Sequence, residues 1–322
     1  MQRKHMARKT MKAAFFESFG EADVIKVGEL PVPELKEGEV LVKIKAAGVN
    51  PVDAAVRKGM LKDFLPTSFP AIPGWDVAGI VEDRGFAARR FTVGDEVYAY
   101  ARRPLVQWGT YAEYLVIPEA YLAHRPKNIS WEQTAGVPLV GLTSYQSLYV
   151  AGGLREGQTV LILGASGGIG TLSIQLAKSK GATVVGVASA KNHAYMREIG
   201  ADFTVDYHNQ HVGEEVKKIF PDGVDLIFDA ASGKTLEQSL VALKKDGTVV
   251  SILNRGNDID KSIRFHYVFV EPNSMQLDDL RKLAEDGKID VHISKAYALD
   301  NAAEAMRQIE THHTSGKIVI VP

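Results

Sequence analysis

Residues 159–178 read "TVLILGASGGIGTLSIQLAK", and this stretch decides which fold the C-terminal half of the chain takes. An apolar run of strand length stops at Gly164, and three of the next six residues are glycine. A run with helical periodicity follows. Gly164, Gly167 and Gly170 have G-x-x-G-x-x-G spacing, a variant of the commoner G-x-G-x-x-G pattern. Taken alone, such a loop is also compatible with an ordinary glycine-rich turn.

The segments that follow this loop favour a ligand-binding role for it. From Gln158 onward, apolar strands alternate with amphipathic helices, which predicts a parallel sheet covered on both faces. Small residues at a helix N-terminus let the backbone approach a pyrophosphate, where free N–H groups and the helix dipole favour anions. We therefore predict a dinucleotide cradle formed by Gly164, Ala165, Ser166, Gly167, Gly168, Ile169 and Gly170.

The next strand indicates which nucleotide binds. An NAD site usually places Asp or Glu about 20 residues beyond the loop, to hold the ribose hydroxyls. Residues 183–195 contain no acidic residue. Ser189, Lys191 and Asn192 instead offer donors and one positive charge for a 2′-phosphate, and Tyr207 adds a phenol. The prediction is NADPH in preference to NADH; the alternative is a polar loop with a solvated lysine.

Residues 11–126 have a different pattern. Short segments rich in β-branched and aromatic residues, such as 39–49 and 110–118, are separated by Gly and Pro, which predicts a β-rich domain. Ser130 is expected to cap a helix, with Gln133 at the capping-box position, and a second helix is expected to begin near Pro138. The chain closes with an apolar strand at 316–322. We interpret residues 1–10 as a disordered arm or a cloning remnant.

Composition excludes several other classes of function. Lys and Arg number 38 against 39 Asp and Glu, so the net charge of −1 gives no reason to expect nucleic acid or an anionic membrane as a partner. No apolar run approaches the roughly 20 residues of a membrane span. The absence of Cys excludes disulfides and thiolate metal sites and suits the cytoplasm. His208 with His211, and His312 with His313, are interpreted as solvated residues, because no third ligand accompanies them.

The chain resembles the zinc-independent quinone oxidoreductases related to zeta-crystallin, within the medium-chain dehydrogenase/reductase superfamily. The most specific stretch is "GQTVLILGASGGIGTLSIQLAK" (157–178). "AGVNPVDAAVRKG", "PGWDVAGIV", "VGDEVYAY", "GTYAEY" and "PLVGLTSYQSL" also match family stretches, in family order. The resemblance implies an α/β protein with a GroES-like β-rich catalytic domain (11–130, completed by 291–322) and a Rossmann doubly wound parallel sheet domain (131–290) that binds NADPH. It also implies a homodimer.

The same resemblance bears on metal binding and on the reaction. Zinc alcohol dehydrogenases of the superfamily carry Cys and His where this chain has Asn50 and Trp75, and their four-cysteine structural lobe has no counterpart here. We expect no metal. Without a Lewis acid, electron-poor acceptors are favoured: quinones or α,β-unsaturated carbonyls reduced by NADPH. The alternatives are an NADPH-binding sensor or crystallin-like protein with little turnover, and, less favoured, a zinc-type alcohol dehydrogenase.

The resemblance also assigns roles to particular residues. Asn50 would lie near the nicotinamide and donate to the acceptor oxygen; the alternative is an Asn that caps its own turn. Thr143 would contact the nicotinamide ribose or ring, or else only pack its helix. Lys317 would lie near the cofactor phosphates, although a surface lysine is the competing interpretation. The remaining cofactor contacts implied by the family come from "LNRG" and "FVEPN", namely Leu253, Asn254, Phe269 and Val270.

The acceptor pocket departs from the family pattern. Bacterial members often carry two tyrosines where this chain has Ala55 and Leu61, so the pocket is expected to be more apolar or wider. Aromatic walls from Phe64, Trp75, Tyr100 and Trp108 are one interpretation of this region, and core packing is the other. Asp53 and Arg57, four residues apart on an expected helix, are interpreted as a structural ion pair.

Overall fold

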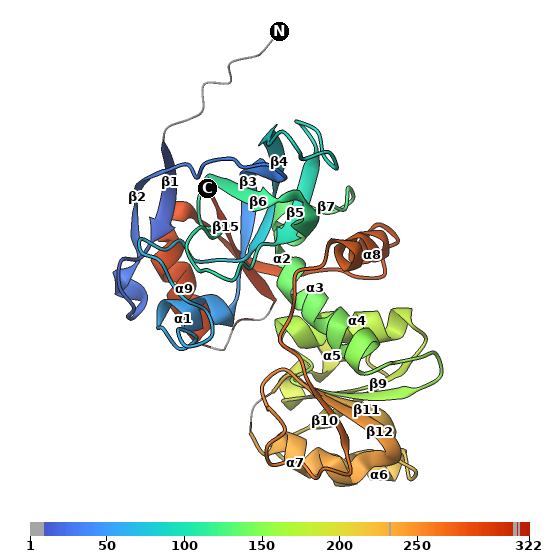
Figure 1. Cartoon of the computed structure of the whole chain (residues 1–322). Helices are drawn as coiled ribbons and strands as arrows, with labels where there is room; N and C mark the ends of the chain where they lie inside the picture. Colours follow the sequence, from blue (N-terminus) through green and yellow to red (C-terminus); the bar gives the residue numbers. More distant parts are fainter. Residues whose placement is uncertain (1–9, 232, 312–313, 315) are drawn as a thin grey trace. The chain divides into compact units, whose positions relative to one another are not determined.

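The computed structural model describes residues 10–231, 233–311, 314 and 316–322. The chain divides into two compact units, residues 1–139 with 272–285 and 291–322, and residues 140–271 with 286–290. Each unit is built around its own sheet (Figure 1). The expected arm at residues 1–10 lies outside the described residues except for Thr10, which begins the first strand.

The first unit is the β-rich one. Its main sheet has the order β14-β15-β3-β4-β5-β7, and β6 pairs with residues 39–43 of β3, whereas β15 pairs with residues 47–49. A separate two-stranded sheet pairs β1 with β2. The strands are β1 (Thr10–Phe15), β2 (Lys26–Pro31), β3 (Glu39–Val49), β4 (Asp76–Arg84), β5 (Glu96–Tyr100), β6 (Tyr114–Pro118), β7 (Leu122–His124), β14 (Ile293–Ala298) and β15 (Lys317–Val321). Strands β14 and β15 come from the end of the chain and pair onto β3, so the sheet joins segments that lie far apart in the sequence.

Several helices formed by the described residues accompany this sheet. They are α1 (Pro51–Arg57), α2 (Trp131–Gly136), α8 (Ser274–Glu285) and α9 (Ala302–Glu310). Ser130 caps α2, accepting from the Gln133 N–H at 3.1 Å, and Gln133 Oε1 accepts from the Ser130 N–H, so the expected capping box is confirmed. A second helix, α3 (Pro138–Tyr145), begins at Pro138 as expected. Figure 1 shows α9 beside α1, and α9 also contacts β15.

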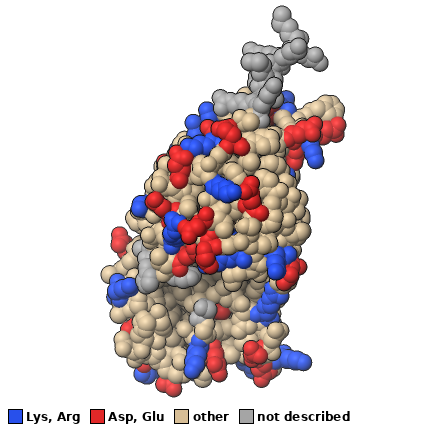
Figure 2. Space-filling model, turned by 90° about the vertical axis from the view of Figure 1, so that its left-hand side faces the viewer, with Lys and Arg blue, Asp and Glu red and all other residues tan. Residues whose placement is uncertain are grey.

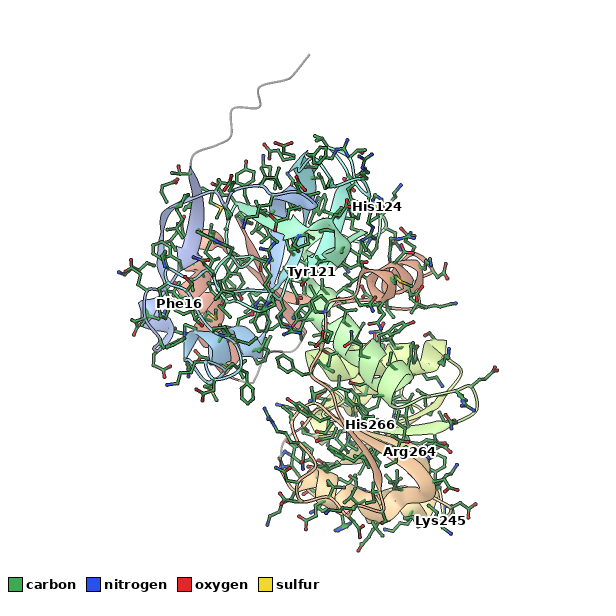
Figure 3. The ribbon with its side chains drawn as sticks, in the orientation of Figure 1. Phe16, Tyr121, His124, Lys245, Arg264 and His266 are labelled. Atoms are coloured by element: carbon green, nitrogen blue, oxygen red, sulfur yellow. The ribbon has the colours of Figure 1, made fainter. Side chains whose placement is uncertain are left out.

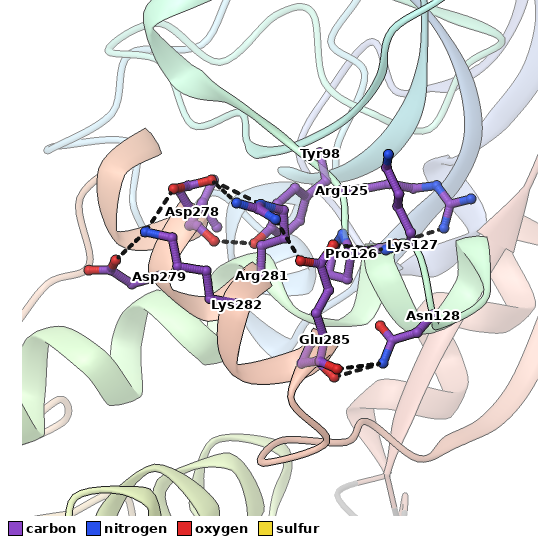
Figure 4. Close-up of polar contacts among 12 residues, drawn as sticks. Tyr98, Arg125, Pro126, Lys127, Asn128, Asp278, Asp279, Arg281, Lys282 and Glu285 are labelled. Atoms are coloured by element: carbon purple, nitrogen blue, oxygen red, sulfur yellow. Dashed lines mark hydrogen bonds and ion pairs between the residues drawn. The ribbon is translucent and has the colours of Figure 1, made fainter.

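Helix α8 is held on β5 and on the residues that follow β7. The Tyr98 hydroxyl donates to the carbonyl of Leu277 at 2.5 Å, and Asn128 Nδ2 donates to the carbonyl of Ala284 at 2.9 Å (Figure 4). Arg281 pairs with two carboxylates of its own helix. Burial raises the pKa of Tyr98 well above its usual range, so its hydroxyl remains a donor. The helix therefore joins the first unit although it follows the parallel strands in sequence.

The second unit contains the expected parallel sheet, with the order β10-β9-β8-β11-β12-β13. Its strands are β8 (Thr159–Leu163), β9 (Thr183–Ala188), β10 (Phe203–Asp206), β11 (Val224–Asp229), β12 (Leu243–Ser251) and β13 (Arg264–Tyr267). Its helices are α4 (Gly168–Ser179), α5 (His193–Glu198), α6 (Val212–Ile219) and α7 (Thr235–Ser239). The chain runs outward from β8 to β10 and then returns to β11, so the direction of winding reverses beside β8, where α/β sheets bind ligands.

One helix is shorter than its sequence pattern indicates. The amphipathic pattern of residues 234–247, "KTLEQSLVALKKDG", predicts a helix over this whole stretch, but α7 ends at Ser239 and β12 already begins at Leu243. Leu243 pairs with Val224 of β11, and Lys244 forms an ion pair with Asp225 at 2.8 Å. Strand pairing with a neighbour far along the chain therefore overrides the local helical periodicity.

The surface of the molecule in Figure 2 shows Lys and Arg interspersed with Asp and Glu, as the balanced composition predicts.

Candidate active site

The glycine loop joins β8 to α4. Gly164 follows the strand with φ +75°, in the left-handed region that favours glycine, and a Cβ there would lie 2.9 Å from the carbonyl oxygen of Ala230. The loop is closed by the N–H of Gly167, which donates to the carbonyl of Gly164 at 3.1 Å. Gly167 is the N-cap residue of α4 with φ −78° and ψ 171°, an extended conformation open to any residue.

The other two glycines of the motif serve different purposes. A Cβ on Gly170 would lie 2.3 Å from the carbonyl oxygen of Gly164, so the fold itself requires glycine at this position. A Cβ on Gly167 would meet only that same oxygen, at 3.5 Å, which is an ordinary contact. Nothing in the described protein therefore requires glycine at 167. Its absent side chain leaves open the N-terminus of α4, as a bound pyrophosphate needs.

Beyond β9 the structure brings three of the predicted nucleotide contacts together. Asn192 Nδ2 donates to the hydroxyls of Ser166 at 3.0 Å and Ser189 at 3.3 Å. Lys191 is exposed on the same short turn, and Tyr207 is 45% exposed just after β10. Donors, a cation and a phenol thus follow the ends of β9 and β10. These features fit the negative charge of a 2′-phosphate.

The loop after β12 is shaped by a buried pair that the sequence analysis missed. Asp229, the last residue of β11, accepts from the Ser251 hydroxyl at 2.6 Å. The Ser251 oxygen in turn accepts from the N–H groups of Leu253 at 3.1 Å and Asn254 at 2.8 Å. Burial raises the pKa of Asp229. The signal for this pair was available, since each residue ends an apolar strand and parallel strands end at one edge of the sheet.

Thr143 and the 269–271 segment also lie in the second unit. Thr143 is buried within α3. Val270 is buried and Phe269 is 39% exposed. Gln146 fixes the end of this segment: its Nε2 donates to the carbonyl of Glu271 at 2.8 Å, and its Oε1 accepts from the N–H of Glu271 at 3.0 Å. Gln146 begins a π-helical turn (Gln146–Ala151), a local irregularity that is often found at functional sites.

In the first unit, Asn50 is the N-cap residue of α1 and is 1% exposed. Its backbone N–H donates to Asp53 Oδ2 at 2.8 Å, whereas its carboxamide turns to other partners. Asn50 Nδ2 donates to Asp76 Oδ2 at 2.8 Å, and Asn50 Oδ1 accepts from the ammonium of Lys317. Asp53 Oδ2 also accepts from the Tyr111 hydroxyl at 2.9 Å. A carboxamide, two carboxylates, an ammonium and a phenol thus form one buried cluster.

Burial controls the protonation of this cluster. It raises the pKa of Asp53 to about 7 and that of Asp76 to about 6, although Lys317 opposes both increases. It also lowers the pKa of Lys317, against the opposing effect of Asp76. Below about pH 7 Asp53 therefore holds a proton, whereas Asp76 stays ionised down to about pH 6 and there forms, with the Lys317 ammonium, the charged core of the cluster.

Lys317 is 5% exposed, so the surface-lysine interpretation is wrong; a contact with the cofactor phosphates stays a prediction. The sequence contained a signal for this cluster, because Asp76 and Lys317 are charges within the apolar stretches "GWDVAGIV" and "GKIVIV". Trp75 and Tyr100 are buried and pack edge to face, as the core-packing interpretation has it, whereas Phe64 is 62% exposed.

A metal site finds little support in these donors. Within the described residues, no three His, Asp or Glu side chains gather closely enough to hold an ion. His312 and His313 lie outside the described residues. Of the two positions where the related dehydrogenases carry zinc ligands, Trp75 has no ligand atom and the carboxamide of Asn50 is already bonded to Lys317 and Asp76. The residues present do not fit zinc.

A glycine cradle at the switch point of a parallel sheet, together with a separate unit that carries a buried polar cluster, defines a nucleotide-dependent oxidoreductase. Models of two protein families match the chain: the alcohol dehydrogenase GroES-like domain over residues 36–127 and zinc-binding dehydrogenase over residues 199–320. The chain belongs to the zinc-independent quinone oxidoreductase family of the medium-chain dehydrogenase/reductase superfamily.

Individual relatives agree with this assignment. The chain is 36% identical to an NADPH-dependent alkenal/one oxidoreductase of Arabidopsis thaliana, covering 98% of this chain and 80% of that protein. It is 34% identical to a 2-methylene-furan-3-one reductase of Solanum lycopersicum, covering 97% of this chain and 79% of that one. Among solved structures, the quinone oxidoreductase from Coxiella burnetii matches with a TM-score of 0.87 at 32% identity, covering 98% of this chain and 100% of that one.

Proposed function

We propose that this protein reduces activated acceptors, α,β-unsaturated carbonyls or quinones, with a hydride from NADPH. The buried cluster around Asn50 supports this function, because it holds a carboxamide donor beside a buried cation. The family resemblance implies that zinc dehydrogenases carry a metal ligand at this position of the sequence. The names of the relatives support the same reaction class, because they describe alkenal, enone and quinone reduction.

The second unit supplies the cofactor site in this proposal. The N–H groups at the start of α4 bind the pyrophosphate above Gly167, and Ser166, Ser189, Lys191 and Asn192 bind the 2′-phosphate. Tyr207 extends this site. Loops fixed by Ser251 and by Gln146 border the nicotinamide through Leu253, Asn254, Phe269 and Val270, with Thr143 beside the ribose. When bound, NADPH supplies a hydride from C4 of its nicotinamide.

On the acceptor side, hydride addition to the β-carbon of an enone moves negative charge onto the carbonyl oxygen. A proton from solvent then completes the reduction. Asn50 Nδ2 is the group we assign to hold that oxygen, because a fixed donor where charge develops lowers the barrier without any metal. Saturated ketones and alcohols lack such an electron-poor carbon, so we expect them to react poorly. The proposed enzyme is therefore metal-free.

The test is NADPH consumption with a panel of acceptors: an alkenal, a cyclic enone, a benzoquinone, and a saturated ketone as a matched control. We expect turnover with at least one of the first three and none with the saturated ketone. Product analysis then separates double-bond reduction from quinone reduction. Tight NADPH binding without turnover on any acceptor would instead favour the sensor alternative.

Two broader properties belong to this proposal. A homodimer is supported by the exposed position of β13, the edge strand of the parallel sheet, which carries Arg264 and His266 (Figure 3). A cytoplasmic location is proposed from the absence of cysteine. No helix formed by the described residues is long and apolar enough to cross a membrane. Sedimentation of the purified protein tests the dimer, and imaging of a tagged chain tests the location.

A further inference from the structure

Lys317 occupies an unusual place for a lysine. It is the first residue of β15 and is almost fully buried. Strand β15 runs antiparallel to β3, with Ile318 opposite Val49, which brings the lysine beside the junction of β3 and α1. There its Nζ donates to the carbonyl of Val49 at 3.1 Å and to Asn50 Oδ1. The Lys317 ammonium therefore contacts the Asn50 carboxamide, the group that we assign to bind the acceptor oxygen.

The two partners of this carboxamide fix its orientation. An ammonium only donates and a carboxylate only accepts, so Lys317 must face the oxygen of Asn50 and Asp76 must face its nitrogen. An amide flipped by 180° would put the nitrogen against the ammonium and the oxygen against the carboxylate. Of the two hydrogens on Nδ2, Asp76 takes one, which leaves the second for an acceptor oxygen.

The charges around the carboxamide also alter its strength as a donor. A cation on the carbonyl oxygen draws electron density from the nitrogen and makes its remaining N–H a better donor, because hydrogen bonds in a chain polarise one another. Lys317 Nζ lies 3.8 Å from Asp76 Oδ2, so the two charges compensate each other within the buried cluster. Lys317 therefore both orients and polarises the carboxamide, whereas Asp76 contributes to its orientation alone.

We propose that Lys317 is a positioning residue of the reaction: its ammonium orients and polarises the Asn50 carboxamide so that the free Nδ2–H binds the acceptor oxygen. This inference rests on the proposed function and adds a residue to it. The hydrogen bonds of the ammonium to Val49 and Asn50, and its ion pair with Asp76, all lie within the first unit. These contacts favour a role of Lys317 in acceptor binding over a contact with a cofactor phosphate.

The first experiment compares Lys317→Met and Lys317→Arg with Lys295→Met, a control that removes an exposed lysine from the neighbouring strand β14. We expect kcat of Lys317→Met to fall roughly 10- to 100-fold, somewhat less than the loss of a direct oxyanion donor, with the Kd of NADPH within about twofold of the parent. Lys317→Arg should retain more activity than Lys317→Met. A raised Kd of NADPH with kcat retained would overturn the proposal in favour of the phosphate role.

Loss of the ammonium alone leaves Asp76 as an unpaired buried charge, so Lys317→Met is also made together with Asp76→Asn. The double variant has no uncompensated charge and should fold, as circular dichroism checks. We expect its kcat to stay as low as that of the single variant. A return to parental kcat would show that the loss came from the stranded carboxylate and would contradict the inference.

The second experiment does not depend on turnover. In protein labelled with ¹⁵N-asparagine, the Nδ2 proton signals of Asn50 are assigned by their loss in Asn50→Asp. We expect the signals in Lys317→Met to move toward the values of exposed amides, while Lys295→Met leaves them in place. Unchanged signals would refute the role of Lys317 even if the parent enzyme is active. An inactive parent with the expected shift would instead refute the proposed function and leave the contact between Lys317 and Asn50 established.

Discussion

Replacing Gly167 by valine separates the binding role of the glycine loop from its role in folding. At φ −78° and ψ 171° the backbone accepts any side chain, and the nearest protein atom to a new Cβ is 3.5 Å away. Removing a glycine stabilises by about 0.4–1 kcal/mol, and losing a good N-cap residue costs a similar amount. We therefore expect the free energy of unfolding to change by no more than about 1 kcal/mol.

Cofactor affinity should behave differently in this variant. The valine side chain lies at the N-terminus of α4, where we propose that the pyrophosphate binds. Losing even one charge-assisted hydrogen bond to the pyrophosphate costs roughly 1.5–3 kcal/mol of binding free energy, which raises Kd at least about tenfold. Fluorescence titration with NADPH and a urea melt on the same sample measure both quantities. Gly170→Ala is the matched control, because its Cβ would lie 2.3 Å from a backbone oxygen. It should destabilise the fold by about 1–3 kcal/mol or more. If Gly167→Val binds NADPH like the parent, the loop is only a turn.

Three further predictions concern single side chains. Lys191→Ala should weaken NADPH binding about tenfold or more and leave NADH binding little changed, by titration with each cofactor; equal losses would refute the 2′-phosphate assignment. Asn50→Ala should lower kcat roughly 100-fold or more while the Kd of NADPH stays constant, and an unchanged kcat would remove the carboxamide from the mechanism. Asp53 has its pKa raised from 3.8 to about 7, so the native state holds a proton that the unfolded state releases, and parental stability falls as pH rises through this window. In urea melts, the fall in the free energy of unfolding between pH 3.8 and about pH 7 should be smaller in Asp53→Asn by an amount on the order of 4 kcal/mol. An unchanged dependence of this free energy on pH would show that Asp53 does not titrate in this range.

The parallel sheet and its loop were predictable because their signals are local. An apolar run, a glycine cluster and a helical period lie within twenty residues of one another, and each is fixed by the backbone geometry of its own segment. The capping box at Ser130 is local in the same way. The early start of β12 was missed because it depends on pairing with β11, which residues 234–247 alone do not encode.

The cluster around Asn50 was predictable only in part. The resemblance picked out Asn50 and Lys317 separately, but their contact joins residues 267 apart and the contact with Asp76 joins residues 26 apart. The expected pair of Asp53 with Arg57 was wrong for a similar reason. Arg57 instead bonds Glu310 on α9, at 2.9 Å, because a tertiary partner for a fully buried guanidinium outweighs an i,i+4 neighbour. Buried charges reveal that a cluster exists, whereas only the fold reveals its members.

The most direct test of the proposed function follows the hydride itself. NADPH carrying deuterium at the transferred C4 position is supplied with a cyclic enone to enzyme treated with a chelator, and the product is analysed by mass spectrometry. We expect one deuterium on the β-carbon of the saturated product and a rate unaffected by chelation. A reduced product without deuterium, or activity that disappears with the chelator and returns with zinc, would contradict metal-free hydride transfer.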